Sequence, residues 1–231
     1  MPSFSANNVR GGSVLPCSRT APIGVPLLFT ATYLIAAFKG HVPWCFPPID
    51  GCTDITHTGF EPPESFLFRF GLIPIAVVMG LLFYFFKEWL EMIAGRPLGR
   101  ARASFYLALA GSICLNASTS LIQGQQDTPI NVHAVFASSF FILMFISQLL
   151  YTLQDYRLRI IEKPLALWIR IISMALQLLL ILINLINWIV TGERPDSAFE
   201  WQITLAYVLW FASFLFERDT VFTNHYRRRH P

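Results

Sequence analysis

The sequence predicts an all-α, polytopic membrane protein: a bundle of six transmembrane helices with both chain termini in the cytoplasm. Three observations predict this fold class. First, 54% of the 231 residues are hydrophobic and only 13% are charged, whereas about 25% of the residues of soluble domains are charged. Second, the apolar residues gather in six runs of near-membrane length. Third, Lys and Arg gather in alternate connections between these runs.

Each apolar run is expected to be a helix that crosses the membrane, because about 20 residues span the hydrocarbon core. In chain order the runs are 23–38, 66–86, 104–121, 132–153, 165–190 and 199–216. The predicted organisation is a cytoplasmic tail (1–22), a membrane domain (23–217) containing a large extracytoplasmic loop (39–65), and a basic cytoplasmic tail (218–231).

The distribution of basic residues predicts the orientation. Basic residues gather in the tails and in the second and fourth connections, and include Arg10, Arg19, Lys87, Arg96, Arg100, Arg102, Arg157, Arg159, Lys163, Arg227, Arg228 and Arg229. The alternate connections carry only Lys39, Arg69 and Arg194. The positive-inside rule then places both termini in the cytoplasm and the 39–65 loop outside it. A net charge of +3 is too small to indicate nucleic-acid binding.

The large loop contains two cysteines, Cys45 and Cys52. Because the predicted orientation puts them on the oxidising side of the membrane, we expect a disulfide between them. The alternative is a pair of free thiols.

Two of the predicted helices carry polar stripes at helical spacing. The stripes are Ser112, Asn116, Thr119, Ser120 and Gln123 in the third run, and Ser173, Gln177, Asn184 and Asn187 in the fifth. Both are expected to face inward, because amides that face lipid would lack partners. They indicate either hydrogen bonds between helices or a polar cleft that admits a lipid headgroup. No charged residue is recognised at the middle of a span, which disfavours a proton pump or a gated ion channel.

The predicted topology brings polar groups of three segments to the extracytoplasmic face. These are Asp50, Asp54, His57, Glu61 and Glu64 of the loop, Asp127, Asn131 and His133 before and in the fourth helix, and Asp196, Glu200 and Trp201 around the start of the sixth. Residues predicted to bind a lipid headgroup or a partner are His57, Glu64, Arg69, His133, Glu200 and Trp201. Arg69 is the best cation for a phosphate; alternatively it pairs with Glu64 or Glu61. His41 is interpreted as a solvated loop residue.

The enzyme alternative uses Asp54, His57 and His133 as a metal site that would activate water at a lipid ester. No HExxH or zinc-finger spacing supports such a site. We therefore expect no metal, no other cofactor and no catalytic residues. A small-solute transporter is a third alternative, and it would need a continuous polar path through the bundle.

Three stretches resemble a known family. HTGFEPPE (57–64), which follows Ile55 and Thr56, is similar to the loop motif of the damage-regulated autophagy modulators. Val132, His133, Ala137 and Phe140 resemble that family's fourth-helix signature, and SAFEW (197–201) resembles the start of its last helix. The wider family includes post-GPI-attachment-to-proteins factor 2 and the N-terminal domain of a yeast cell-wall biogenesis protein.

The resemblance implies a protein of the endomembranes (Golgi, ER or lysosome) or the plasma membrane that takes part in lipid handling or autophagy. The partners it implies are membrane lipids such as a GPI-lipid or a phosphoinositide, together with a membrane protein. His57 replaces the Asp of the autophagy branch. We therefore predict a non-catalytic membrane protein that binds a lipid headgroup or a partner at its extracytoplasmic face. A GPI-anchor or ceramide-remodelling enzyme is the alternative.

Overall fold

The computed structural model describes residues 15–122, 132–158, 164–192 and 197–216, with side chains from residue 22 onward, and this part of the chain contains helices and no strand. The long helices are α1 (Leu15–Lys39), α3 (Glu64–Ala94), α4 (Gly99–Ser120), α5 (Val132–Arg157), α6 (Pro164–Thr191) and α7 (Ser197–Ala212). Short helices are α2 (Pro47–Asp50), η2 (His57–Gly59) and η3 (Ser213–Leu215). Most of the two predicted tails, and Gln123, Asp127, Asn131 and Asp196, lie outside the described residues.

Every predicted apolar run forms a helix, but among the described residues only five helices are long and apolar enough to cross a membrane. The exception is α4, because its 22 residues include Arg, Ser, Thr and Asn side chains. Helix length and hydropathy thus support five of the six predicted spans, and the third is the one that they do not support. In α1 the helix begins at Leu15, whereas its apolar stretch begins at Pro22. The predicted boundary at residue 23 is therefore close to the start of the apolar stretch and not to the start of the helix.

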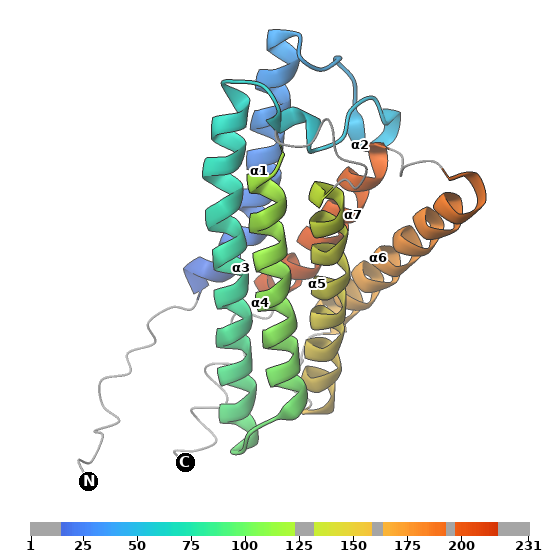
Figure 1. The fold of residues 1–231 in the computed structure, drawn as a ribbon. Coiled ribbons are helices and arrows are strands. Elements are labelled where there is room, and N and C mark those ends of the chain that lie inside the picture. Colours follow the sequence, from blue (N-terminus) through green and yellow to red (C-terminus); the bar gives the residue numbers. More distant parts are fainter. Residues whose placement is uncertain (1–14, 123–131, 159–163, 193–196, 217–231) are drawn as a thin grey trace.

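The six long helices form one bundle (Figure 1). We call the region between their axes, which is occupied largely by side chains, the central space. In sequence order α1, α3, α4 and α5 pack side by side, and α7 packs against α1 and α6. Within the described residues the backbone of α7 does not closely approach that of α3, α4 or α5. We call the end of the bundle that carries residues 40–63 the loop end, and the end that carries residues 95–98 the far end. Side chains fill the central space differently at these two ends.

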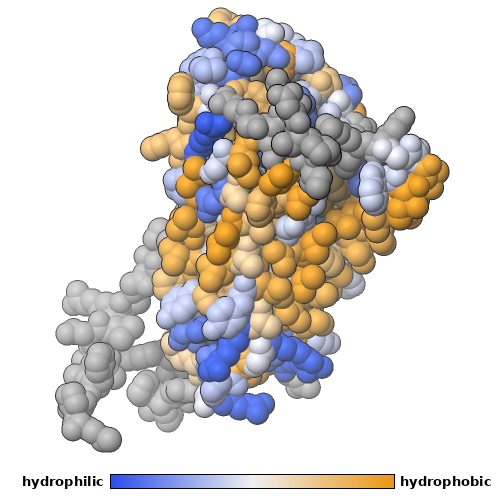
Figure 2. Space-filling model, in the orientation of Figure 1, coloured by the Kyte–Doolittle hydropathy of each residue, from blue (hydrophilic) through white to orange (hydrophobic). Residues whose placement is uncertain are grey.

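The surface supports a multi-pass membrane protein. On the face seen in Figure 2, hydrophobic side chains form a broad band around the middle, with hydrophilic side chains at both ends. The band includes α6, which tilts away from the other helices toward the loop end (Figure 1) and exposes large apolar side chains such as Ile186, Trp188 and Ile189. Lipid is the environment in which such a surface is stable.

The polar stripe of α6 turns inward over only part of its length. Ser173 and Gln177 are fully buried. Ser173 Oγ donates to the Ala206 carbonyl of α7 at 2.6 Å, and Gln177 Nε2 donates to Gln148 Oε1 of α5 at 3.0 Å. These bonds confirm hydrogen bonding between helices. Asn187 is exposed, so the prediction is wrong for it, because α6 tilts away from the bundle there.

In the α4 stripe Ser112 and Thr119 are buried, but the polar side chains mainly bond to the helix itself. Thr119 Oγ1 donates to the Leu115 carbonyl at 2.7 Å, and Ser120, which is exposed, donates to the Asn116 carbonyl at 2.8 Å. Such bonds to the preceding turn let a polar side chain lie in an apolar environment. The α4 stripe therefore satisfies part of its own hydrogen-bonding capacity, whereas Ser112 Oγ and Asn116 Oδ1 are buried without a partner among the described residues.

The far end of the central space is packed with aromatic rings and a buried ion pair. Phe83, Phe86, Tyr151, Trp210, Phe211 and Phe214 form a continuous ring cluster. The Arg170 guanidinium, fully buried, donates from Nη1 to Asp155 Oδ2 and from Nε to Ser213 Oγ at 2.9 Å. It also lies 4.1 Å from the centre of the Phe214 ring.

Sequence reasoning missed this ion pair, although Arg170 lies inside the predicted run 165–190. A charged residue within an apolar run was the signal, since such residues generally pair inside the bundle. Because Arg170 lies in the first quarter of α6 (Pro164–Thr191), an expectation that concerned only the middle of each span did not cover it.

Candidate functional site

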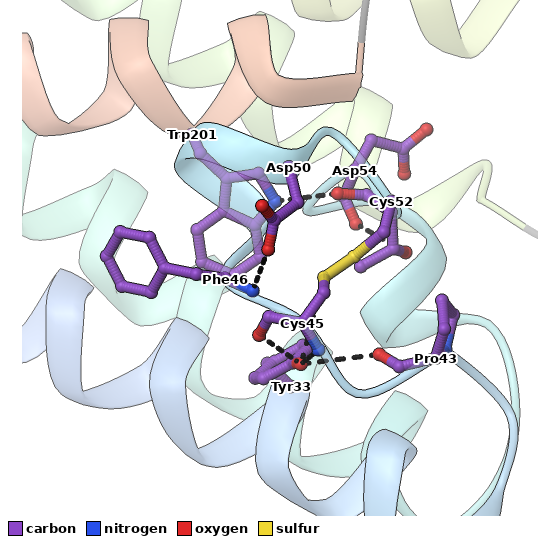
Figure 3. The surroundings of a disulfide bond; sticks show 9 residues. Tyr33, Pro43, Cys45, Phe46, Asp50, Cys52, Asp54 and Trp201 are labelled. Carbon is purple, nitrogen blue, oxygen red and sulfur yellow. Dashed lines mark hydrogen bonds between the residues drawn. A yellow bond between two sulfur atoms is a disulfide. The ribbon is translucent and has the colours of Figure 1, made fainter.

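The first connection, residues 40–63, folds down onto the loop end of the bundle, and a disulfide closes its first half. Cys45 and Cys52 are bonded, which confirms the predicted pairing (Figure 3). The Tyr33 hydroxyl of α1 accepts from the Cys45 N–H at 2.8 Å and donates to the Cys45 carbonyl at 2.8 Å. Asp50 Oδ2 accepts from the Phe46 N–H at 2.6 Å, which holds the turn around α2.

Helix α7 anchors the same loop from the other side. Trp201 Nε1 donates to the Thr53 carbonyl at 2.9 Å, and Gln202 Nε2 donates to the Pro48 carbonyl at 2.9 Å. The Trp201 ring is buried and packs edge-on against Phe29 and Tyr33. Trp201 was predicted to contact a ligand or partner; in the structure it anchors the loop.

The second half of the loop presses against α3. A Cβ atom on Gly59 would lie 2.6 Å from Phe68 Cγ, so only glycine fits in this contact. Thr58 is fully buried, and its hydroxyl lies 3.3 Å from that of Thr32 in α1. The segment that carries the HTG motif is therefore held closely against two helices.

Glu64 and Arg69, both predicted to bind a ligand, lie apart from the other site residues. Glu64 is fully buried, and its Oε1 bonds to His41 Nδ1. His41 is therefore not merely a solvated residue. Arg69 is partly buried, its Nε has no hydrogen-bond partner among the described residues, and it makes no ion pair there with Glu64 or Glu61.

His57 and Asp54 pair with each other at the surface of the loop. Asp54 Oδ1 accepts from the His57 N–H at 2.6 Å and lies 2.7 Å from His57 Nδ1. The hydrogen bond to Asp54 raises the pKa of His57, partly opposed by burial. Among the described residues no group of three or more His, Cys, Asp or Glu side chains is placed to hold a metal ion, so Asp54, His57 and His133 do not form one.

His133 and Glu200 meet at Thr56, which joins three elements at the loop end. Thr56 Oγ1 lies 3.3 Å from His133 Nε2 of α5 and 3.2 Å from Glu200 Oε2 of α7. The Thr56 N–H also donates to Glu200 Oε2 at 3.4 Å. On its other side, His133 Nδ1 lies 2.9 Å from the Ser118 carbonyl of α4. We call Thr56, Ser118, His133 and Glu200 the polar cluster.

The polar cluster closes one side of a cavity of about 90 Å³ in the central space. Its walls come from α1, α3, α4, α5 and α7 and are mainly apolar, with side chains such as Phe29, Leu72, Phe140 and Val208. All four residues of the polar cluster, together with Thr204, line it. An apolar cavity with a few convergent polar groups is typical of a small-molecule site.

The sequence predicts His133 and Glu200 as site residues, whereas Thr56 stands out only as a neighbour of the HTGFEPPE motif. Thr56 is brought into the site by the anchoring of the loop through Tyr33 and Trp201, which depends on distant contacts. In the sequence, apolar residues that line the cavity, such as Leu72 and Phe140, cannot be distinguished from other buried apolar residues. The sequence carries no signal for the cavity itself.

The polar cluster contains a hydroxyl within reach of an imidazole, an arrangement used by enzymes that form covalent intermediates. Such enzymes also need free N–H groups to stabilise an oxyanion. Here the N–H groups that follow one another along the loop are engaged: Thr56 with Glu200, His57 with Asp54, Thr58 with Ile55, and Gly59 with Thr56. These four N–H groups of the loop are therefore not free to stabilise an oxyanion.

The model of the family described as Frag1/DRAM/Sfk1/Cwh43P N-terminal domain matches residues 20–221, which include all the described helices apart from the start of α1. No curated protein and no solved structure matches the chain.

Proposed function

The chain belongs to the Frag1/DRAM/Sfk1/Cwh43P N-terminal domain family, and from that premise we propose that it is a non-catalytic membrane protein that binds a membrane lipid at the loop end. In this proposal the lipid's polar end contacts the polar cluster, and part of its chain enters the cavity. The family resemblance favours a role in lipid handling or autophagy in an endomembrane or the plasma membrane.

The proposed topology has six crossings, with α4 as the third, so that both termini are cytoplasmic. The disulfide of the loop end favours an extracytoplasmic location, because disulfides persist in oxidising compartments. Arg96, Arg100 and Arg102 lie at the far end, as the positive-inside rule requires of cytoplasmic connections. Helix α4 packs between α3 and α5 over its length (Figure 1), so protein covers its polar side chains on two sides.

One observation carries the binding proposal: an apolar cavity and a polar cluster share the same space. An amphiphile needs both. Its chain can move from lipid into an apolar cavity without a free-energy cost of desolvation, whereas its polar head needs hydrogen-bond partners. A volume of about 90 Å³ is below the range of about 300–1,000 Å³ typical of ligand pockets. The cavity therefore takes a head and the first part of one chain, and the rest of the lipid lies outside.

The test is to fill the cavity and measure the lipid that stays with the protein. Ala137 lines the cavity, so Ala137→Phe places a ring in the proposed chain site. The matched control is Ala103→Phe, on an exposed position of α4. Native mass spectrometry of both variants, purified in mild detergent, should show bound lipid in the control and in the parent protein but not in Ala137→Phe.

Unchanged lipid occupancy in a folded Ala137→Phe protein contradicts the proposal. Should this variant fail to fold, Val208→Phe fills the cavity from α7. Unchanged occupancy in the Val208→Phe protein contradicts the proposal equally.

A further inference from the structure

We propose that the cavity selects a lipid with an uncharged hydroxyl head, such as an acylglycerol or a long-chain alcohol, over a lipid with a phosphate or an amine at that position. This inference rests on the proposed lipid binding and adds the chemistry of the head. It follows from the protons and charges of the polar cluster and from two polar atoms that form no hydrogen bond within the described part of the chain.

The hydrogen bonds of His133 determine where its protons lie. His133 Nδ1 lies 2.9 Å from the Ser118 carbonyl, which can only accept, and 3.0 Å from the Ser118 hydroxyl, which can donate or accept. The carbonyl, at the shorter distance, favours a proton on Nδ1. In neutral His133, Nε2 is then an acceptor and takes the hydroxyl proton of Thr56. In charged His133, Nε2 donates to the Thr56 oxygen instead.

Thr56 has a single hydroxyl proton and two neighbours, His133 and Glu200. If the proton points to neutral His133, the 3.2 Å contact with Glu200 is a hydrogen bond only when Glu200 is protonated and donates. If His133 is charged and donates to Thr56, the hydroxyl donates to an ionised Glu200. In both arrangements His133 and Glu200 together carry no net charge.

In the described part of the chain, the two other charged groups that act on Glu200 are also paired. Asp54 and His57, whose charges act on each other and on Glu200, form an ion pair when His57 is protonated. None of the described residues that line the cavity is Lys or Arg. Arg69 is not among the lining residues, and Arg170 is paired with Asp155 at the far end. A phosphate or an ammonium head would thus introduce an uncompensated charge into an apolar space, which is strongly unfavourable.

Two atoms remain for a ligand, and they complement a hydroxyl. Glu200 uses Oε2 for Thr56, and its Oε1 accepts no hydrogen bond from the described residues. Thr204, four residues later and so on the same face of α7, lines the cavity, and its hydroxyl bonds to no described residue. A hydroxyl head can donate to Glu200 and accept from Thr204 at the same time.

The test compares single-chain lipids of equal chain length that differ only in the head: a monoacylglycerol, a lysophosphatidic acid and a long-chain amine. Each is titrated onto the delipidated protein in detergent, and occupancy is measured by native mass spectrometry. We expect the monoacylglycerol to bind at least about tenfold more tightly than either charged lipid, which corresponds to a difference of about 1.4 kcal/mol in binding free energy. Ala137→Phe should abolish that binding, which shows that the cavity is the site.

Two variants test the roles of the free atoms. Thr204→Val removes the hydroxyl at nearly constant shape, and Glu200→Gln keeps an acceptor for Thr56 but removes the carboxylate. Each should weaken monoacylglycerol binding about threefold to tenfold, the range for one hydrogen bond. Thr30→Val, on an exposed position of α1, is the matched control and should change nothing.

The outcomes separate the two proposals. If no lipid binds in a manner that Ala137→Phe abolishes, lipid binding in the cavity is refuted, and this inference with it. If lipids bind in the cavity but the lysophosphatidic acid or the amine binds as tightly as the monoacylglycerol, only the choice of a hydroxyl head is overturned. Full affinity of both Thr204→Val and Glu200→Gln would also overturn it.

Discussion

The two ends of the central space contrast in how the protein satisfies buried polar groups. At the far end, Arg170 and Asp155 pair with each other among closely packed rings. At the loop end, the polar cluster borders a cavity of about 90 Å³, and Glu200 Oε1 and the Thr204 hydroxyl form no hydrogen bond with any described residue. The same six helices thus build one end that is filled by a buried ion pair among packed rings, where Asp155 Oδ1 alone of the pair's carboxylate oxygens has no hydrogen-bond partner among the described residues, and one end that keeps a cavity beside its polar side chains.

This difference assigns separate tasks to the two ends. The far end joins α5, α6 and η3 through a charge pair and a hydroxyl, and so contributes to stability. The loop end depends on a covering segment that is anchored to α1 and α7 by hydrogen bonds and closed by a disulfide. Substitutions at the far end should therefore change folding, and substitutions at the loop end should change binding.

The largest effect is expected for Arg170→Met. Removing one partner of a buried ion pair leaves Asp155 without its cation, which costs about 3–5 kcal/mol of unfolding free energy. Denaturant unfolding of the protein in detergent measures the loss. The double variant Arg170→Met with Asp155→Leu should recover much of it, because both charges are then absent. A loss below about 1 kcal/mol for Arg170→Met would remove the contrast between the two ends.

The next effect concerns the disulfide. Cys45→Ser with Cys52→Ser opens an eight-residue loop, for which the expected loss is at the lower end of the usual range, about 2 kcal/mol. Hydrogen–deuterium exchange should rise in the loop and at the loop end of α1 and α7. Faster exchange around Trp210 and Phe214 at the far end would show that the two ends are not independent.

Some parts of this contrast could be predicted from the sequence, and others could not. Helix positions follow from the apolar runs, because membrane thickness fixes their length. The Cys45–Cys52 bond follows from the predicted orientation. The pairing of Arg170 with Asp155 depends on how α5 and α6 face each other, and the position of Thr56 depends on contacts with α1 and α7. Neither follows from spacing along the chain.

A pair of matched substitutions compares the packing at the two ends directly. Ala166 of α6 is fully buried, whereas Ala137 lines the cavity. Ala166→Leu should cost about 1–3 kcal/mol through overpacking. Ala137→Leu should cost less or stabilise the protein, since its extra atoms enter empty space. Thermal unfolding of both variants in the same delipidated detergent preparation gives the comparison, and equal losses would contradict it.

The smallest effect is a pH dependence at the loop end. The hydrogen bond to Asp54 raises the folded-state pKa of His57, so its contribution to stability is present below the unfolded pKa, about 6.5, and is lost as pH rises through the raised value. The effect is small because the His57 side chain is more than half exposed. The difference in melting temperature between the parent protein and His57→Gln should therefore shrink from about pH 5.5 to about pH 8.5. In an Asp54→Asn background the shift should be absent; the same shift there would contradict this cause.

The central claim is that the loop end, unlike the far end, holds a lipid. A cryo-electron-microscopy structure of the protein in lipid nanodiscs tests it most directly. We predict an elongated density in the cavity, with its head within hydrogen-bond distance of Glu200 and Thr204, and only side-chain density around Arg170 and Trp210. A cavity closed by its own side chains, or one that holds only separate water peaks, would contradict the account.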